Sequence, residues 1–579
     1  MNTSKNLNNN LIYIPMKQPL IECVPNFSEG KNKSIIDAIV YSIAAVENIK
    51  VLNVDMGSAT NRTVVTFVGP PDAVIEAAFQ GIKKAGELID MRLHKGEHPR
   101  MGSTDVCPLV PIRDITMEET VHYAIQLAKR VGEELQIPVY LYEYAQPKEY
   151  RKNLSIIRAG EYEGFFEKIK KPEWKPDFGP DEMDAKRGAT VIGARNFLIA
   201  YNVNLNTTSV RRANSVAFDV REAGRVMREG GKPTGKIIYN EDGTPKIQPG
   251  MCKAVKAIGW YIEEYGIAQV SMNLTDINIT PLHKAFEACC ISAEKRGLRV
   301  TGSELVGLIP LKALTDAGKY FLKKQGLSSG VSEKELIKIA VKTLGLDELK
   351  PFKPEERIIE YLIADPKESE LISKSVKDFT DTTASESPAP GGGSVSALCG
   401  ALGAALGAMV ANLSANKKGW EEQTEWFSNY AEQLQTAKDK LLQLVDKDTI
   451  AYNQVLAAFA LPKNNEEEKA KRKKAIEDAT YNALLVPYET MKISIECLDI
   501  LQLMAENGNP NSVSDAGVGA MCIRTAVIGA SMNVKINAKD ILHLYNVQDI
   551  LKHTEELEQL AEQKEKIIRH IVQQKINGN

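Results

Sequence analysis

The chain has 579 residues, of which 43% are hydrophobic and 25% are charged, and its formal net charge is -3. This composition is typical of soluble proteins, and the length predicts about three or four domains. The charge balance gives no sign of a nucleic-acid-binding protein, although an acidic small molecule would need only a local basic patch. The eight cysteines form no C-x-x-C pair, which predicts reduced thiols in the cytoplasm rather than a disulfide framework.

The N-terminal third of the chain divides into a tail and a pattern of alternating strands and helices. Residues 1–19 are rich in asparagine and lack the apolar core of about 7–15 residues that a secretory signal has, so we predict a disordered tail. Residues 20–145 show strand and helix patterns in the order β-α-β-β-α-β, followed by an α-β extension, and the subdomain is predicted to span 20–194. This order is that of the split sheets of ferredoxin-like folds.

Residues 195–327 repeat the scheme. The strand patterns FLIAYNVNL, AVKAIGWYIEE, IAQVSMNLT and ELVGLIP alternate with helical patterns over 207–228 and 281–297. We therefore predict a multidomain protein with two α+β ferredoxin-like (βαββαβ) subdomains and a ligand cleft between them. The Gly- and Pro-rich stretch 229–250 is an excursion whose role is open. Residues 328–365, which prolines punctuate, are predicted to be a connector.

From 366 to 579 the strand signal disappears, and long helical periodicities predict an all-α helical bundle domain. Between Ser387 and Lys417 the chain carries no charge, so its length alone would allow a membrane span. Alanine and glycine dominate there and serines interrupt the run, which favours a buried helix in a close-packed bundle. We interpret the charged run 463–478 as a solvated turn and helix face, not as a binding site.

The stretch MRLHKGEHPRMGSTDVCP (91–108) contains an H-x-x-E-H pattern formed by His94, Glu97 and His98. A zinc site of this type needs both histidines on one face of an unbroken helix. Gly96 lies between them, and Pro99 disfavours the α conformation of the residue before it. The pattern therefore argues against a metal site.

The same stretch suits proton transfer. A histidine with a pKa near 6.5 can accept a proton at neutral pH. The cations Arg92, Lys95 and Arg100 are expected to hold an acidic substrate. From these residues alone, a surface loop with incidental histidines stays an open alternative.

The helical pattern over 423–460 carries a second candidate. At about 100° per residue, Asp448 falls in the middle of an apolar stripe, whereas Asp446 falls on nearly the opposite face. The stripe consists of Tyr430, Leu434, Ala437, Leu441, Leu444, Val445, Tyr452, Val455 and Phe459. An ionised carboxylate on a buried face is costly unless it is paired or functional. The pattern leaves two interpretations of Asp448 open, a catalytic carboxylate and a buried structural anchor.

Long stretches of the chain resemble one enzyme family. IECVPNFSEG (21–30), NVDMGSATNRTVVTFVG (53–69), IDMRLHKGEHPRMGSTDVCPLVPIR (89–113) and TVIGARNFLIAYNVNL (190–205) are similar to the formimidoyltransferase half of bifunctional formimidoyltransferase-cyclodeaminases. SPAPGGGSVSALCGALGAALGAMV (387–410), LVDKDTIAYNQV (444–455) and NGNPNSVSDAGVGA (507–520) resemble the cyclodeaminase domain. The resemblance covers nearly everything from about residue 20 to 560.

The resemblance implies two reactions. The first transfers the formimino group from N-formimino-L-glutamate to N5 of tetrahydrofolate. The second cyclises 5-formiminotetrahydrofolate to 5,10-methenyltetrahydrofolate and releases ammonia, and both belong to histidine degradation and one-carbon folate metabolism. The alternatives are a glutamate formiminotransferase fused to a methenyltetrahydrofolate cyclohydrolase-type domain, or a non-catalytic folate-binding scaffold.

The resemblance also implies site residues. The histidine of the G-E-H-P-R segment, the transferase base of the family, corresponds to His98, and the cyclodeaminase aspartate of the V-D-x-D segment corresponds to Asp448. Asp55 is predicted to orient His98, with a helix-capping or turn-forming aspartate as the alternative. The folate-binding candidates are Gly179, Pro180, Asp181, Glu182, Met183, Asp184, Ala185, Lys186, Arg187 and Gly188 in one segment, and Gly250, Lys253, Lys256 and Gly259 in another. The cyclodeaminase ligand-loop candidates are Gly391, Gly392, Gly393, Ser394, Asn509 and Asp515.

Two of these assignments keep an alternative. The segment 388–394 could be a simple loop-to-helix entry, and Asp515 could stabilise an N-terminal helix turn. As co-substrate we expect tetrahydrofolate, in polyglutamylated form, and no metal. As partners we expect the small-molecule substrates and further copies of the chain in a homo-oligomer, but neither nucleic acid nor a membrane, in a cytoplasmic enzyme.

Because the 94–98 segment does not suit a helical zinc motif, the purified protein is expected to contain no stoichiometric zinc by elemental analysis. A chelator should leave transferase and cyclodeaminase activity intact. A loss of transferase activity that added zinc restores would contradict the general-base interpretation of His98.

Overall fold

The computed structural model describes residues 19–578 except 59, 97, 98, 232, 233 and 545, and the side chains of 367 and 368. The predicted tail over 1–19 therefore lies almost wholly outside the described residues. The described chain forms two compact units. The first comprises residues up to 313 together with 344–363, and the second comprises 314–343 and 364–579. The protein is thus multidomain, with an N-terminal α/β region and a C-terminal helical region.

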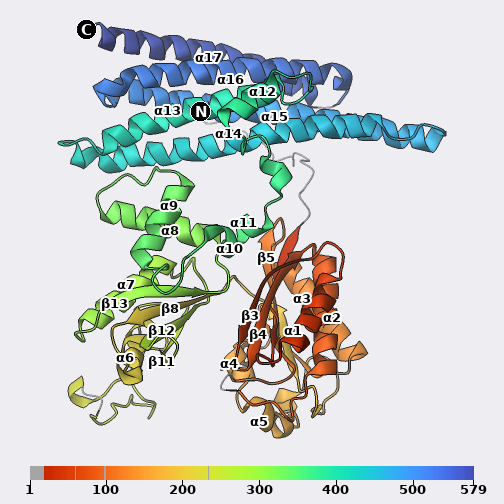
Figure 1. Ribbon diagram of the computed structural model, residues 1–579, viewed down its shortest axis with the longest axis vertical. Helices are drawn as coiled ribbons and strands as arrows, with labels where there is room; N and C mark the ends of the chain where they lie inside the picture. Colours follow the sequence, from red (N-terminus) through yellow and green to blue (C-terminus); the bar gives the residue numbers. More distant parts are fainter. Residues whose placement is uncertain (1–18, 59, 97–98, 232–233, 545, 579) are drawn as a thin grey trace, which may run out of the picture. The chain divides into compact units, whose positions relative to one another are not determined.

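A seven-stranded sheet forms the first part of the first unit (Figure 1). Its strands are β1 (Leu20–Cys23), β2 (Asn26–Phe27), β3 (Lys50–Gly57), β4 (Arg62–Gly69), β5 (Thr104–Arg113), β6 (Val139–Glu143) and β7 (Thr190–Ala194). β3 pairs with β4, β4 with β1 and β2, and β1 and β2 with β5, all antiparallel. β7 and β6 extend the sheet in parallel beyond β5. The long helices between these strands are α1 (Lys33–Ala44), α2 (Pro71–Leu88) and α3 (Met117–Glu134), and the short helices α4 (Leu154–Ile157) and α5 (Glu161–Lys168) lie between β6 and β7.

The two faces of this sheet differ in polarity. Ile21 and Cys23 of β1, with Phe67 of β4, belong to a fully buried core that includes α1, α2 and α3. Since successive side chains of a strand point to opposite faces, Glu22 and Thr66 lie on the other face. Figure 1 shows the three helices on one side of the strands. The face without these helices therefore carries buried polar groups.

A four-stranded antiparallel sheet forms the second part of the first unit, in the order β11-β12-β8-β13. Its strands are β8 (Ile199–Leu205), β11 (Val255–Ile262), β12 (Ile267–Leu274) and β13 (Val300–Val306), with helices α6 (Val210–Val220) and α7 (Leu282–Glu294). The prediction of a helix over 207–228 is wrong at its C-terminal end. Arg221 is extended, and β9 (Arg225–Val226) pairs with β10 (Ile247–Gln248) to close the 229–250 excursion.

Five long helices form most of the second unit, and they lie side by side in Figure 1. They are α13 (Gly392–Ala415), α14 (Thr424–Phe459), α15 (Glu466–Asn507), α16 (Val513–Ala538) and α17 (Val547–Ile576). At Gly400, Gly403 and Gly407 of α13 a Cβ would come to 2.8 or 2.9 Å from atoms of neighbouring helices, so a larger residue would force those atoms to move. By length and composition, Gly392–Ala415 and Pro510–Ile541 could each cross a membrane, and 61% and 44% of their most apolar windows are buried inside the protein.

The predicted connector over 328–365 divides between the two units. Most of α8 (Leu311–Lys324) and most of α9 (Glu333–Leu344) belong to the second unit. Ser329 donates to Glu432 of α14 at 2.5 Å. The short helices α10 (Pro354–Arg357) and α11 (Ile359–Ile363) belong to the first unit.

Asp446 ties the start of the helical unit to α14. It is 2% exposed, and its carboxylate accepts the backbone N–H groups of Leu371 at 2.7 Å and Ile372 at 3.3 Å. Burial raises the pKa of Asp446, and the two backbone donors oppose the rise. The periodicity predicts Asp446 on the face of α14 opposite the apolar stripe, and the segment after Pro366–Ser369 covers that face. Helical periodicity cannot reveal cover that comes from a distant segment.

Replacing Asp446 by alanine should leave both backbone N–H groups without an acceptor in a buried place. We expect Asp446→Ala to lower the free energy of unfolding by about 1–3 kcal/mol, measured from the urea midpoint of helical circular dichroism. Asp439→Ala on the same helix, whose side chain is 50% exposed, is the matched control and should change stability by less than about 0.5 kcal/mol. Equal effects of the two variants would contradict the anchoring role.

Candidate functional site

The loop that follows α2 is held in turns rather than in a helix, with backbone hydrogen bonds from Leu93 to Asp90 and from His94 to Met91. Arg100 Nε donates to Nδ1 of His94 at 3.3 Å, and Nε2 of His94 lies 2.9 Å from the carbonyl oxygen of Asn61. With Nδ1 as an acceptor, Nε2 carries the proton and donates it to that carbonyl. Neither ring nitrogen of His94 is then available to a metal.

His98 and Glu97 lie outside the described residues, so the assignment of His98 as the base stays a prediction. Over the ranges that the structure describes, no group of three or more His, Cys, Asp or Glu side chains is placed to hold a metal ion.

The arginines of the loop are neutralised within the protein. Arg100 is 9% exposed and pairs with Glu161 at 2.9 Å and with Glu163 at 2.7 Å, both on α5 (Glu161–Lys168). Arg92 pairs with Asp90 at 2.5 Å. The expectation that these arginines hold an acidic substrate is wrong for Arg100, because two carboxylates already occupy its guanidinium.

A buried charged cluster lies beside the loop, and the sequence analysis missed it. Asp105, at the start of β5, is 1% exposed and accepts from Met101 N at 3.0 Å and from Arg158 Nη2 at 2.5 Å. Burial raises the pKa of Asp105, while Arg158 and Arg62 oppose the rise. Arg62 is itself desolvated, which lowers its pKa. A lone aspartate in an otherwise apolar strand was the sequence signal for this cluster.

Asp55 lies within β3, opposite Val64 of β4, and its side chain is exposed. It therefore neither caps a helix nor forms a turn, and that alternative is wrong. Its charge acts on Arg62 and favours the charged form of that arginine. The β3–β4 turn contacts the loop, since Asn61 Nδ2 donates to the carbonyl of Lys95 at 2.9 Å.

The first predicted folate segment, Gly179–Gly188, runs beside the same loop. Met91 N donates to the carbonyl of Lys186, and Ser103 N to that of Arg187, both at 2.8 Å. Asp184 accepts from Arg187 Nε at 2.6 Å, and Asp181 pairs with Lys175. Of the others, Gly179 and Gly188 adopt positive φ, Glu182 is exposed, Pro180 is half-buried, Met183 packs on the core and the carbonyl of Ala185 accepts from the Tyr162 hydroxyl. The backbone of this segment thus supports the loop, while Asp184 and Asp181 are already paired with cations.

The second predicted folate segment lies in the other sheet. A Cβ on Gly250 would come to 1.9 Å from the carbonyl of Arg221, and one on Gly259 to 2.2 Å from Asn214 N of α6. Both glycines are therefore needed for packing. Lys253 is exposed, and Lys256 Nζ donates to Asn153 Oδ1 at 3.3 Å. The contacts of its described residues do not join this segment to the loop after α2.

The side of the second sheet that faces away from α6 and α7 carries amide and carboxylate groups. Gln269 Nε2 donates to Asn204 Oδ1 at 2.8 Å, and Trp260 Nε1 donates to Gln269 Oε1 at 3.2 Å. Tyr265 donates its hydroxyl to Glu304 at 3.0 Å. The alternation of asparagine in YNVNL was the sequence signal for this polar face, which the sequence analysis did not use.

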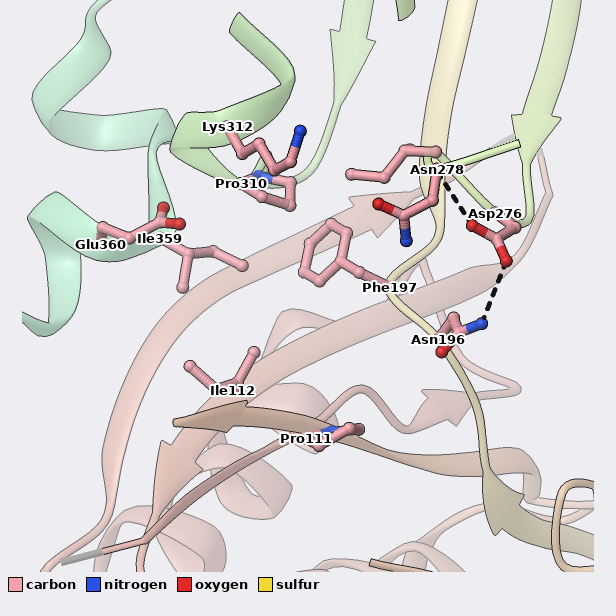
Figure 2. Close-up of a pocket in the computed structure, with 11 residues that line it drawn as sticks. Pro111, Ile112, Asn196, Phe197, Asp276, Asn278, Pro310, Lys312, Ile359 and Glu360 are labelled. Atoms are coloured by element: carbon pink, nitrogen blue, oxygen red, sulfur yellow. Dashed lines mark hydrogen bonds between the residues drawn. The ribbon is translucent and has the colours of Figure 1, made fainter. Parts of the chain in front are cut away.

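A cavity of about 300 Å³ opens at the C-terminal end of β5 (Figure 2). Asn196 Nδ2 and Asn278 N both donate to Asp276, at 3.3 and 2.9 Å. At about 3.3 Å per residue along β5, the cavity is on the order of 20 Å from Thr104, which follows the loop. The cavity is lined by Pro111, Ile112, Asn196, Phe197, Asp276, Ile277, Asn278, Pro310, Lys312, Ile359 and Glu360. No predicted site residue that the structure describes is among them.

One buried carboxyl lies behind this cavity. Glu22 of β1 is opposite Val110, which precedes the cavity-lining Pro111. Burial raises the pKa of Glu22 to about 7, and the charge of Arg195 opposes the rise.

Asp448 lies on α14 against the first turn of α13. Ser394, which is fully buried, donates its hydroxyl to Asp448 Oδ2 at 3.0 Å and lies 3.3 Å from Thr449 Oγ1. A Cβ on Gly393 would come to 2.1 Å from Asp448 Oδ1, so only glycine fits there. Burial raises the pKa of Asp448, and the donors of Ser394 oppose the rise. This arrangement gives a carboxyl group that can accept a proton and return it.

The remaining ligand-loop candidates divide between the two ends of α13. Gly391 caps the helix, and Gly392 lies near Asn533 of α16, so these residues adjoin Asp448. Asn509 N donates to Ser414 Oγ at 2.8 Å, near the other end of α13. At about 1.5 Å per residue, that is on the order of 30 Å from Ser394. Asp515 lies in the first turn of α16, where its alternative interpretation as a helix-turn stabiliser applies.

Three family models match the chain: the N-terminal subdomain of the formiminotransferase domain over 20–195, the formiminotransferase domain over 200–364, and formiminotransferase-cyclodeaminase over 375–556. The formimidoyltransferase-cyclodeaminase of Gallus gallus is 46% identical over 524 residues, which are 90% of this chain and 93% of the relative. The glutamate formimidoyltransferase of Thermoplasma acidophilum is 42% identical over 324 residues, 55% of this chain and 98% of the relative.

A methenyltetrahydrofolate cyclohydrolase of Methylorubrum extorquens is 34% identical over 205 residues, 35% of this chain and 99% of the relative. The shorter relatives each match only part of the chain, whereas the bifunctional relative matches 90% of it. The chain therefore belongs to the formimidoyltransferase-cyclodeaminase family.

Proposed function

We propose that the two reactions of this bifunctional enzyme take place at separate sites, with His98 in the first unit and Asp448 in the second. The protein transfers the formimino group from N-formimino-L-glutamate to N5 of tetrahydrofolate, and then cyclises the product to 5,10-methenyltetrahydrofolate with release of ammonia. The observation that carries the two-site assignment is the half-buried carboxyl of Asp448, which lies against Gly393 and accepts the hydroxyl of Ser394 at the start of α13.

In the transferase step, a base must take the proton of N5 as that nitrogen attacks the formimino carbon. The same proton then goes to the amino nitrogen of glutamate as it leaves, so the step balances. Both ring nitrogens of His94 are engaged, which supports His98 as the base. Asp55 would orient His98, and the exposed carboxylate of Asp55 on β3 beside the β3–β4 turn supports this role.

In the cyclodeaminase step, N10 attacks the carbon of the protonated formimino group. Asp448 takes the proton that N10 loses and returns it to the amine, which leaves as ammonia while the methenyl cation forms. A carboxyl whose pKa is raised by burial suits both halves of this exchange.

The cyclohydrolase relative favours a second candidate, in which the helical unit hydrolyses methenyltetrahydrofolate. The two are distinguished by one assay on purified protein. Supplied 5-formiminotetrahydrofolate should yield ammonia and methenyl absorbance, whereas a cyclohydrolase would consume supplied methenyltetrahydrofolate and release no ammonia.

The proposal includes the setting of the enzyme. Exposed apolar residues of α13 and α16, such as Leu402, Leu413, Val518 and Met521, support contact with a second copy rather than with lipid. The tetrahydrofolate would be polyglutamylated, no metal would take part, and the enzyme would be cytoplasmic. We also propose that both sheets belong to ferredoxin-like subdomains over 20–194 and 195–327, which their strand orders support.

The two sites should fail separately. His98→Ala is expected to lose formimino transfer by about 10²–10⁴-fold, because a general base is removed, and still to convert supplied 5-formiminotetrahydrofolate. Asp448→Asn should transfer normally and accumulate 5-formiminotetrahydrofolate without releasing ammonia. Asp439→Asn on the same helix is the control. If either substitution abolished both reactions in folded protein, the two-site assignment would be wrong.

Ser394 should set the pH range of the second reaction. Its hydroxyl donates to the carboxylate of Asp448 and so favours the ionised form, which means that Ser394→Ala raises the pKa of Asp448 further. The base must be ionised to take the N10 proton, so the acidic limb of the rate of ammonia release should move to higher pH. Thr449→Val removes a hydroxyl that lies beside the Ser394 hydroxyl and not one that donates to Asp448, so it should move the acidic limb less. An unchanged or opposite shift in Ser394→Ala would count against Asp448 as the base.

A further inference from the structure

The neighbouring helices α14 and α16 extend past the N-terminus of α13, so α13 does not cover their last turns. Gly393 of α13 lies against Asp448 of α14, and Gly392 lies near Asn533 of α16. α14 continues from Asp448 to Phe459, and α16 continues from Asn533 to Ala538. Past these points, the side chains that face the position of α13 have no part of α13 to cover them.

Those side chains form an exposed apolar strip. Residues three, four, seven, eight and eleven positions after Asp448 share its face of the helix. Tyr452, Leu456 and Phe459 on that face of α14 are exposed, as is Ile536, three residues after Asn533 on α16. An exposed aromatic and aliphatic strip that begins at a half-buried carboxyl is suited to the flat, apolar part of a ligand.

The strip ends at a cavity of about 420 Å³ with a basic lining. The guanidinium of Arg472 lies 5.7 Å from the ring centroid of Phe459, the last residue of the strip. The cavity is lined by Lys463, Lys469, Arg472, Lys473, Ile476, Glu477 and Asp540, so four cations face two carboxylates. The charged run 463–478 was interpreted as a solvated face, but part of it lines this cavity.

The charges of the cavity are only partly balanced. Lys469 pairs with Glu466 at 2.8 Å, and Lys473 lies 4.0 Å from Glu477, which His543 also approaches at 3.2 Å. Arg472 donates to the carbonyl of Phe459 at 3.0 Å rather than to a carboxylate. The cavity therefore favours an anion, and carboxylates suit lysine and arginine donors.

We propose that 5-formiminotetrahydrofolate lies along this strip, with its reactive ring at Asp448, its aminobenzoyl group on Tyr452 and Phe459, and its glutamyl carboxylates in the basic cavity. At about 1.5 Å per residue, Phe459 at the end of α14 is on the order of 15 Å from Asp448, and the basic cavity lies beyond Phe459. The pteridine, aminobenzoyl and glutamyl groups each have about the length of two extended residues, or about 7 Å, so the extended ligand spans this distance. The proposal rests on the proposed cyclodeaminase function and adds the site for the anionic end of its substrate.

The test is the double variant Lys463→Glu with Lys473→Glu, compared with Lys471→Glu. Lys471 is on the same charged run, its side chain is 74% exposed, and it does not line the cavity. The double variant should raise KM for ammonia release about tenfold, with kcat unchanged within about twofold, because the reversed charges repel the carboxylates without touching the reacting atoms. Lys471→Glu should change KM by less than about twofold.

A substrate without the anionic end sharpens the test. With 5-formiminotetrahydropteroate, which lacks the glutamyl group, the double variant should have the KM of the unmodified protein, as a double-mutant cycle requires. Added glutamyl residues should lower KM in the unmodified protein and lose this effect in the double variant. The proposal would be overturned if Lys471→Glu raised KM as much as the double variant does. It would also be overturned if the double variant raised KM equally for the pteroate substrate, or did not raise KM at all.

Two further measurements separate this proposal from the proposed function. Transferase activity should be the same in all variants, and Lys463→Gln with Lys473→Gln, checked by circular dichroism, should give a smaller rise in KM in folded protein. If the unmodified protein released no ammonia, the proposed function would fail. The proposed binding site would then be tested by equilibrium binding of the unreactive 5-formyltetrahydrofolate. Unchanged binding in the charge-reversed protein would overturn the proposal, and loss of one binding site would support it.

Discussion

The contact between Asp448 and the first turn of α13 is the constraint on which the helical unit depends. The carboxylate occupies the space that a Cβ of residue 393 would need, and it accepts the hydroxyl of Ser394. Further along α13, Gly400, Gly403 and Gly407 let the neighbouring helices pack closely against α13. Small residues therefore serve two purposes in one helix, since they permit close packing and they bring a buried carboxyl to the helix start.

The position at which α13 begins also determines what the surface beyond it can do. A longer α13 would cover Tyr452, Leu456 and Phe459, and the apolar stripe of α14 would be ordinary core. Because α13 starts level with Asp448, the same stripe is core on one side of the carboxyl and exposed surface on the other. A half-buried carboxyl at the end of an exposed apolar strip suits the proposed binding of a long, partly aromatic substrate.

The first unit handles its charges differently. Around the loop after α2, Arg100 pairs with Glu161 and Glu163, and Arg158 pairs with the buried Asp105, so these charges hold the backbone rather than offer charge to a substrate. Paired and desolvated charges of this kind are costly to separate, and they make a loop rigid without regular secondary structure. In the helical unit, by contrast, burial raises the pKa of the Asp448 carboxyl, and no arginine or lysine is among the causes that oppose the rise.

The sequence by itself determined what local periodicity and turn chemistry control. Apolar residues that recur every second position predicted the strands around Ile21 and Val203. A period of 3.6 residues predicted α14 with Asp448 on its apolar face. Gly96 and Pro99 argued against a helix in the H-x-x-E-H stretch. Only the tertiary structure decided which distant groups cover or neutralise a residue. Asp446 is buried by the backbone of Leu371, Arg100 is occupied by Glu161 and Glu163, and Asn509 lies at the far end of α13 from Asp448. The helical prediction to 228 failed for the same reason, since the pairing of β9 with β10 competes with the local helical preference. These outcomes depend on contacts between segments far apart in the chain, and neither hydrophobic period nor residue type encodes such contacts at the position where they act.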